Sequence, residues 1–198
     1  MPSPTSYAER GSSAVRSRDA QRLETRARVF DAAVAEIGRS GLAGADVSAI
    51  ARAAGVVRGT FYFHFPTKEH VLVELERAEE AKIVAALGTR TTSPDDLTSM
   101  LTLLVRKVLA AERRLGAVIF RDMLGLHFSS TRPVEDALAE HPLAEFVIAA
   151  IAEAQGAGRV SRNADPGELG VIFMTGLFAC SPLQGLRLGR GPRCWTDT

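Results

Sequence analysis

The spacing of hydrophobic residues along the chain predicts helices. Between residues 21 and 40, apolar side chains recur at three- and four-residue steps, as expected for one face of a helix. Gly38 and Gly41 mark the end of this helix, because glycine readily takes the left-handed conformation that follows a helix C-terminus. The sequence contains no runs of strictly alternating polar and apolar residues, so we expect an all-α fold.

Two short elements follow. Asp46 is a predicted N-cap of a short helix whose apolar stripe includes Ile50 and Ala51, and Gly55 closes this helix. By periodicity alone, residues 57–65 fit either a strand or a short helix. Pro66 ends that element, and the next helix is predicted to run from Thr67 to about Leu87.

Further helical patterns cover the rest of the chain, and Pro142 either kinks or divides the third of them. The patterns lie at residues 95–111, 113–128, 133–155 and 165–180, with room for a short helix at 183–188. Residues 1–20 are rich in Ser, Arg, Pro and Ala and have almost no large apolar side chains. Such a segment buries too little surface to offset its ordering entropy, so we expect a mobile arm.

Residues 46–68 predict a helix-turn-helix. Ala51 lets the two short helices cross closely, and Gly55 permits the reversal between them. Val56, Phe61 and Phe65 are expected to be buried under the pair. The outward side of the second helix then carries a glycine, a hydroxyl, a guanidinium and two aromatic donors, which suits a helix that enters a DNA groove. These outward residues are Arg58, Gly59, Thr60, Tyr62 and His64.

Residues 50–69, IARAAGVVRGTFYFHFPTKE, resemble the DNA-binding motif of TetR-type transcriptional regulators, and the likeness extends over roughly residues 24–75. The resemblance implies a three-helix DNA-binding domain over residues 21–68 and a helical ligand-binding and dimerisation domain over residues 69–198. It also implies a homodimer on a palindromic operator in double-stranded DNA, released by a small apolar effector. The implied DNA contacts are Ser48, Val57, Arg58, Gly59, Thr60, Tyr62, His64 and Lys68.

One departure from the family pattern concerns the start of the recognition helix. Val57 stands where the family often has Ser or Thr, so its side chain cannot cap the helix, and the helix start either frays or makes a methyl contact with thymine. Two structural alternatives stay open for this region. The aromatic residues between Phe61 and Phe65 can all be core, and Lys68 can be an ordinary solvated side chain.

In the second half of the chain, a stripe of apolar residues that includes one polar side chain, His127, predicts a ligand pocket. Each member can equally be an ordinary core residue. The candidates are Phe120, Met123, Leu124, His127, Phe146, Phe173 and Leu177. The resemblance implies that the last two helices form the dimer interface. Residues 165–180 supply one of them, with Gly170 and Gly176 permitting close approach, and only the short helix at 183–188 is available for the second.

Charge and composition narrow the function classes. The net charge of the chain is only +1, but residues 1–68 carry an excess of four positive charges. This N-terminal part is therefore expected to contact a polyanion such as DNA. The longest apolar stretches are too short to span a membrane, and there is no signal-peptide pattern, so we expect a cytoplasmic protein.

The sequence gives little support for catalysis. Cys180 and Cys194 have no histidine at zinc-finger spacing, and Asp122, His127 and Glu135 do not share a helical face. No phosphate-binding loop, nucleophile elbow or zinc-protease motif is present. We therefore expect no enzyme activity, catalytic residue, metal or cofactor. The alternatives to a ligand-responsive repressor are a DNA-binding regulator without a ligand and, less favoured, a small helical enzyme.

Overall fold

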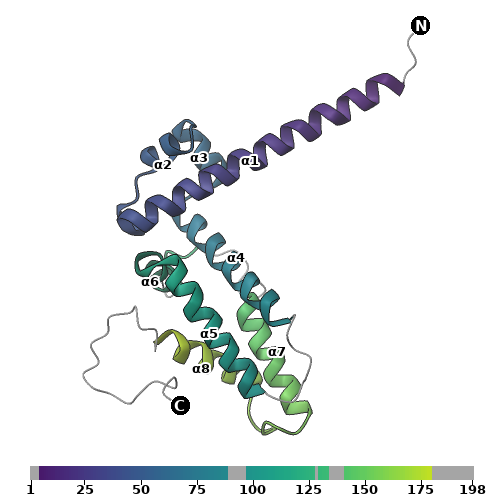
Figure 1. Cartoon of the computed structure of the whole chain (residues 1–198), viewed down its shortest axis with the longest axis vertical. Helices are drawn as coiled ribbons and strands as arrows, with labels where there is room; N and C mark the ends of the chain where they lie inside the picture. The colour runs from purple at the N-terminus through teal and green to yellow at the C-terminus, as the bar shows by residue number, and fades with distance from the viewer. Residues whose placement is uncertain (1–4, 89–96, 128, 134–140, 180–198) are drawn as a thin grey trace. The chain divides into compact units, whose positions relative to one another are not determined.

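The protein is all-helical in the residues that its computed structural model describes, which are 5–88, 97–127, 129–133 and 141–179 (Figure 1). The predicted fold class is thus confirmed. The helices are α1 (Thr5–Gly44), α2 (Val47–Ala53), α3 (Arg58–His64), α4 (Lys68–Gly88), α5 (Leu97–Leu115), α6 (Ala117–His127), α7 (Pro142–Gly156) and α8 (Pro166–Ala179). None of these described helices combines the length and the apolar character needed to cross a bilayer.

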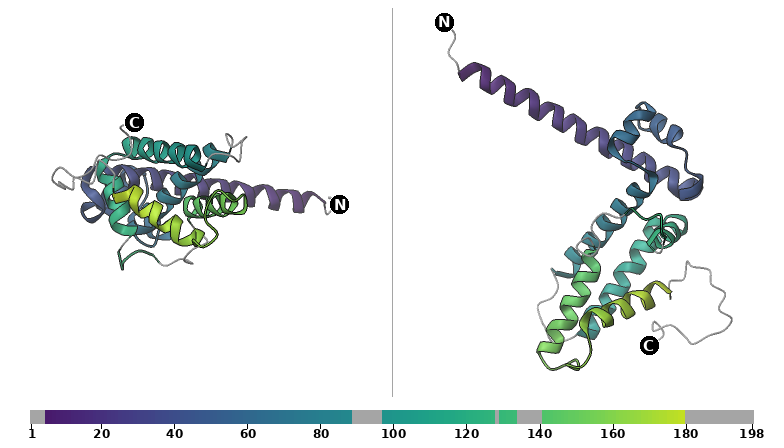
Figure 2. Two further views of the ribbon diagram at one scale, coloured as in Figure 1. Left: turned by 90° about the horizontal axis from the view of Figure 1, so that it is seen from below. Right: turned by 180° about the vertical axis from the view of Figure 1, so that it is seen from behind.

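The chain divides into two compact units, residues 1–71 and residues 72–198. In the first unit, α2 and α3 pack against the C-terminal part of the long helix α1, and the rest of α1 extends beyond them (Figures 1 and 2). The helical path of α1 is interrupted at Gly41, which has φ 73° and ψ 162°, values that only glycine adopts easily. The helix therefore breaks at Gly41, one of the two glycines that the sequence indicated, and a last helical turn continues to Gly44.

The start of α1 differs from the expectation for the first 20 residues. Residues 5–20 continue α1, where the composition predicts a mobile arm. Starting a helix is costly, but adding a residue to an existing one is nearly neutral. The packed part of α1, which buries Val29, Ala33 and Ile37, supplies the nucleus from which the helix extends backward.

Two aromatic rings form the core between the short helices and α1. Phe61 and Phe65 are 0% and 1% exposed, and their ring centroids lie 6.1 Å apart. Phe30 of α1 packs on Phe65, also at 6.1 Å. Ala51 is buried where α2 and α3 meet, as expected, whereas Val56 in the turn is only half-buried.

The second unit packs α5 against both α6 and α7, and α8 lies along α7. Its core contains residues from α4 to α7, and partly buried side chains of α8 pack on them. Leu87, Leu104, Val108, Leu143 and Val147 are among its most buried members.

Glycine and proline decide the helix boundaries in the second unit. The structure ends α5 at Leu115, later than the predicted break near residue 112, because Gly116 takes the left-handed conformation with φ 84°. Pro142 divides the predicted 133–155 helix, since α7 begins at this proline. The predicted helix at 183–188, Cys180 and Cys194 lie outside the described residues, and so does Glu135.

Candidate nucleic-acid interface and internal cavity

The turn between α2 and α3 is built by local backbone chemistry. Asp46 caps α2 as predicted, with its Oδ1 accepting the Ser48 backbone N–H at 2.9 Å. This hydrogen bond holds the pKa of Asp46 below its usual value. Gly55 reverses the chain with φ 68°, where a side chain would be strained. Val57 begins α3 without a side-chain cap, as its apolar side chain requires.

Because Phe61 and Phe65 face inward, the other side of α3 faces solvent. Of the predicted contact residues, five are exposed and three are half-buried. Ser48, Val57, Arg58, Gly59 and Tyr62 are exposed, and Thr60, His64 and Lys68 are half-buried. Val57 is 74% exposed, an unusual position for a large apolar residue.

Arg58 and Tyr62 form a pair on the exposed side of α3. They lie one helical turn apart, and Arg58 Nη2 donates to the Tyr62 hydroxyl at 3.2 Å. The guanidinium carbon also lies 5.7 Å from the centre of the Tyr62 ring. The pair presents several hydrogen-bond donors in a fixed arrangement, which suits phosphates and base edges.

His64 ends α3 beside two arginines of α1. Burial first, and then the charges of Arg22 and Arg26, lower the pKa of His64. The imidazole is therefore mainly neutral at pH 7 and retains one N–H donor.

Lys68 has a role within the first unit that the sequence did not reveal. Its Nζ donates to the carbonyl oxygens of Ala43 and Ala45, at 3.3 and 2.9 Å. These bonds join the start of α4 to the end of α1. An ammonium group has three donors, so one is left to meet a phosphate.

A cavity of about 40 Å³ lies within the second unit, with room for a few water molecules. Three predicted pocket residues, Phe120, Met123 and Leu124, line it. Phe146, Phe173 and Leu177 pack against the core of this unit instead, and His127 pairs with a glutamate. The remaining lining residues are Glu76, Glu79, Glu80, Ile83, Val108, Ala111, Leu115, Leu143 and Phe178.

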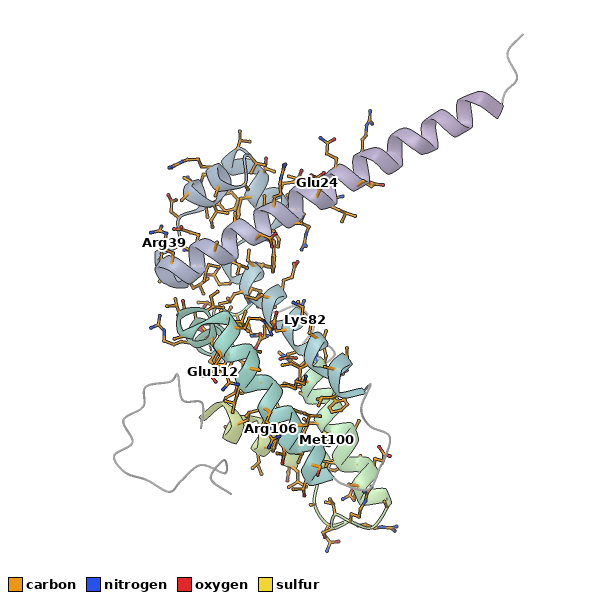
Figure 3. The ribbon with its side chains drawn as sticks, in the orientation of Figure 1. Glu24, Arg39, Lys82, Met100, Arg106 and Glu112 are labelled. Atoms are coloured by element: carbon orange, nitrogen blue, oxygen red, sulfur yellow. The ribbon has the colours of Figure 1, made fainter. Side chains whose placement is uncertain are left out.

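The three cavity glutamates come from one face of α4, and each has cationic partners. Glu76 pairs with Arg132 at 2.8 Å and with His127 at 3.3 Å. Glu79 pairs with Arg114 of α5 and with Lys82 at 2.9 Å, and Figure 3 labels this lysine on α4. These ion pairs compensate the carboxylates that burial would otherwise disfavour.

The third carboxylate, Glu80, holds the start of α7. It lies 3.6 Å from His141 Nδ1 and accepts the Leu143 backbone N–H at 3.3 Å. The imidazoles of His141 and His127 are in contact, with ring centroids 5.3 Å apart. The nearby Glu80 carboxylate raises the pKa of His141.

Glu76 shows two opposing effects on one carboxyl group. Burial by itself raises its pKa, but the hydrogen bond from His127 and the charge of Arg132 outweigh burial and leave the pKa lowered.

Among the described residues, no three His, Cys, Asp or Glu side chains are arranged to hold a metal ion.

Part of the chain matches a known protein family. Residues 29–75 match the family described as bacterial regulatory proteins, tetR family. A comparison with curated protein sequences finds no match.

Solved structures share the fold over most of the chain. A putative tetR family transcription regulator from Shewanella sp. PV-4 is 21% identical, with a TM-score of 0.58 over 78% of this chain and 82% of that chain. FadR from Thermus thermophilus, a TetR family repressor in complex with lauroyl-CoA, is 23% identical, with a TM-score of 0.59 over 79% and 84%. An ArpA-like gamma-butyrolactone receptor is 24% identical, with a TM-score of 0.54 over 80% and 81%.

The contact between His141 and Glu80 predicts a pH dependence of stability. Folding raises the pKa of His141 above the unfolded value of about 6.5. The protonated imidazole therefore contributes fully to the free energy of unfolding below that value, and this contribution is lost as the pH rises through the folded pKa. We expect the advantage of the wild type over His141→Gln, measured as the free energy of unfolding in denaturant titrations, to shrink between about pH 6 and 8. A difference that is constant over this range would contradict the prediction.

Proposed function

We propose that this chain is a TetR-type regulator, a cytoplasmic transcriptional repressor that binds a palindromic operator as a homodimer. In this proposal, it leaves the operator when a small ligand with an apolar body occupies the cavity of the second unit. The observation that carries the DNA-binding part is the exposed side of α3, which lies inside the region that matches the family.

Gly59 supports a close approach of DNA to this side of α3. A Cβ at this position would meet no atom of the chain within 4 Å, and the backbone is not in the left-handed region. Glycine inside a helix costs roughly 0.5–1 kcal/mol relative to alanine. No contact within the described part of the protein requires glycine at position 59. Close approach of the DNA groove to α3 would require it, because a side chain would fill the space between them.

An apolar face of α8 supports the homodimer. Val171 and Ile172 are 63% and 67% exposed, and a Cβ at the exposed Gly176 would meet nothing within 4 Å. The opposite side of α8 already packs on α7, so closely that a Cβ at Gly170 would lie 2.8 Å from Ile148 Cγ1. A second copy of the same helix fits the free face, since a twofold contact pairs one patch with itself.

The cavity supports a ligand with an apolar body. Nine of its twelve lining residues are apolar, and its three carboxylates already have cationic partners. The lauroyl-CoA of one similar structure and the gamma-butyrolactone named for another are compatible with such walls. Ligand pockets usually have about 300 Å³ or more, so binding here has to separate the surrounding helices.

Helix α4 supplies a direct route from the cavity to the DNA-binding unit. It begins at Lys68, which holds the end of α1, and its later turns carry Glu76, Glu79 and Glu80. In this proposal, a ligand acts on the DNA-binding unit along α4, because this helix contains both Lys68 and the cavity glutamates. Coupling of this kind typically changes affinity by 1–3 kcal/mol, roughly 5–150-fold.

The variant Gly59→Ala tests the DNA contact. We expect it to stabilise the free protein by about 0.5–1 kcal/mol, because alanine favours the helix. Affinity for a duplex that the wild type selects from random sequences should fall by about tenfold, or 1.4 kcal/mol, measured by fluorescence anisotropy. Gly125→Ala is the matched control, since Gly125 is an exposed helical glycine of α6 with equally open space. Unchanged affinity of Gly59→Ala would contradict the proposed contact.

The variant Ile172→Glu tests the dimer. A carboxylate in the middle of an apolar contact loses hydration without gaining a partner, so we expect the dimer dissociation constant to rise by at least about tenfold. Sedimentation equilibrium measures this change. Leu23→Glu is the control, because Leu23 is also 67% exposed but lies on α1. Equal dimerisation of the two variants would remove α8 from the interface.

The variant Ala111→Leu tests the effector cavity. Ala111 lines the cavity and is 4% exposed, whereas its neighbour Ala110 is exposed. We expect lauroyl-CoA or a gamma-butyrolactone to release the wild type and Ala110→Leu from DNA, while Ala111→Leu stays bound because the added methyl groups occupy the site. Anisotropy titrations at fixed protein concentration measure the release. Release of Ala111→Leu at the same ligand concentration would place the ligand elsewhere.

A further inference from the structure

Phe63 is a phenylalanine in solvent at the end of α3. It is 67% exposed, while Phe61 and Phe65 on either side of it are buried. Residues two positions apart face opposite sides of a helix, so Phe63 contributes little to the core. Its ring contacts two groups, the imidazole of His64 at 5.0 Å and the guanidinium of Arg22, whose carbon lies 5.2 Å from the ring centre.

Arg22 comes from α1, in the same unit, and brings its charge to the end of α3. Among the described residues, no carboxylate forms an ion pair with it within 4.0 Å, and its guanidinium lies over the Phe63 ring. A guanidinium stacked on an aromatic face keeps its N–H donors at the edge of the plane, where an acceptor can reach them. The ring therefore orients Arg22 without using its donors.

Further positive charge lies beside Arg22. Arg26, one turn along α1, lies with its guanidinium carbon 4.6 Å from the centre of the Phe65 ring. Arg18, one turn in the other direction, is exposed on the same helix face. The charges of Arg22 and Arg26 reach His64, because both arginines, after burial, lower the pKa of its imidazole.

The position along α3 indicates which part of DNA this group would meet. In helix-turn-helix proteins, the first residues of the recognition helix contact base edges. Phe63 lies five residues after Arg58, which corresponds to about 7.5 Å of helix rise. A guanidinium held beside these later residues by α1 is therefore away from the base-reading end, and half or more of the hydrogen bonds from protein to DNA go to phosphate and sugar.

We propose that Arg22, oriented by the ring of Phe63, binds a backbone phosphate of the operator. The proposal rests on the DNA-binding function above and adds an interaction from α1 to those of α2, α3 and Lys68. Phe63 acts here as a positioning residue. This gives a physical reason for an exposed phenylalanine that the core does not need.

The salt dependence of DNA binding tests the proposal. A side chain that neutralises a phosphate releases counterions, so the slope of log K against log[salt] becomes shallower by about 0.9 for each phosphate that is no longer neutralised. We expect this change per protomer in Arg22→Ala, with the same decrease in affinity on the selected duplex and on a scrambled one. Arg28→Ala is the control, because Arg28 is exposed on α1 about 120° around the helix from Arg22.

The variant Phe63→Leu separates positioning from charge. It keeps an apolar side chain but removes the aromatic face, so we expect a smaller decrease in affinity than in Arg22→Ala, and Phe63→Tyr should restore the affinity. The combination of Phe63→Leu with Arg22→Ala should bind no more weakly than Arg22→Ala alone. Thermal unfolding midpoints should be unchanged, because both side chains are exposed.

Three results would overturn the inference. A wild-type salt slope in Arg22→Ala would show that Arg22 meets no phosphate. A decrease in affinity confined to the selected duplex would assign Arg22 to base recognition, and additive decreases in the double variant would remove the positioning role of Phe63. Binding of the wild type to the selected duplex is measured in parallel, so failure of the DNA-binding function is seen separately.

Discussion

The orientation of α3 depends on two buried aromatic rings. A helix of seven residues does not hold its own shape in water, because nucleation costs more than so few hydrogen bonds return. Phe61 and Phe65 fix it by packing on each other and, through Phe30, on α1. Since these two residues take the inner face, Gly59 and Phe63 lie on the opposite side of α3, and Arg58 and Tyr62 flank the core with exposed side chains. The chemistry of the outer face thus depends on packing beneath it.

The second unit is organised by charge as much as by apolar packing. Glu76, Glu79 and Glu80 are each at most 9% exposed, and buried carboxylates are costly unless they are paired. Their partners come from α5, from the start of α7 and from the segment after α6. Removing one partner would leave a charge in the interior, so these ion pairs fix where α4 runs. A buried polar network whose members are paired makes the walls of such a cavity rigid.

Features of the fold that depend on neighbouring residues could be predicted from the sequence, and features that depend on residues distant in sequence could not. The Asp46 cap and the Gly55 turn need only neighbouring residues, and both predictions are confirmed. The break at Gly116 was placed a few residues too early, although Glu112, Arg113, Arg114 and Leu115 are good helix formers and continue α5. The cavity glutamates were missed, because carboxylates at three- and four-residue spacing on α4 have the pattern of a solvated face. Only partners that are distant in sequence reveal that they are buried.

The same limit applies to α8, whose sequence is apolar on nearly all sides. A helix of this kind is stable in water only when more than one face is covered. Within the second unit, α7 covers the side that carries Gly170, and Val171 and Ile172 remain on the surface. Among the described residues no segment covers that surface, and the homodimer proposed above would cover it. In the proposed dimer, the two copies of α3 would be related by the twofold axis, and each would bind one half of a palindrome.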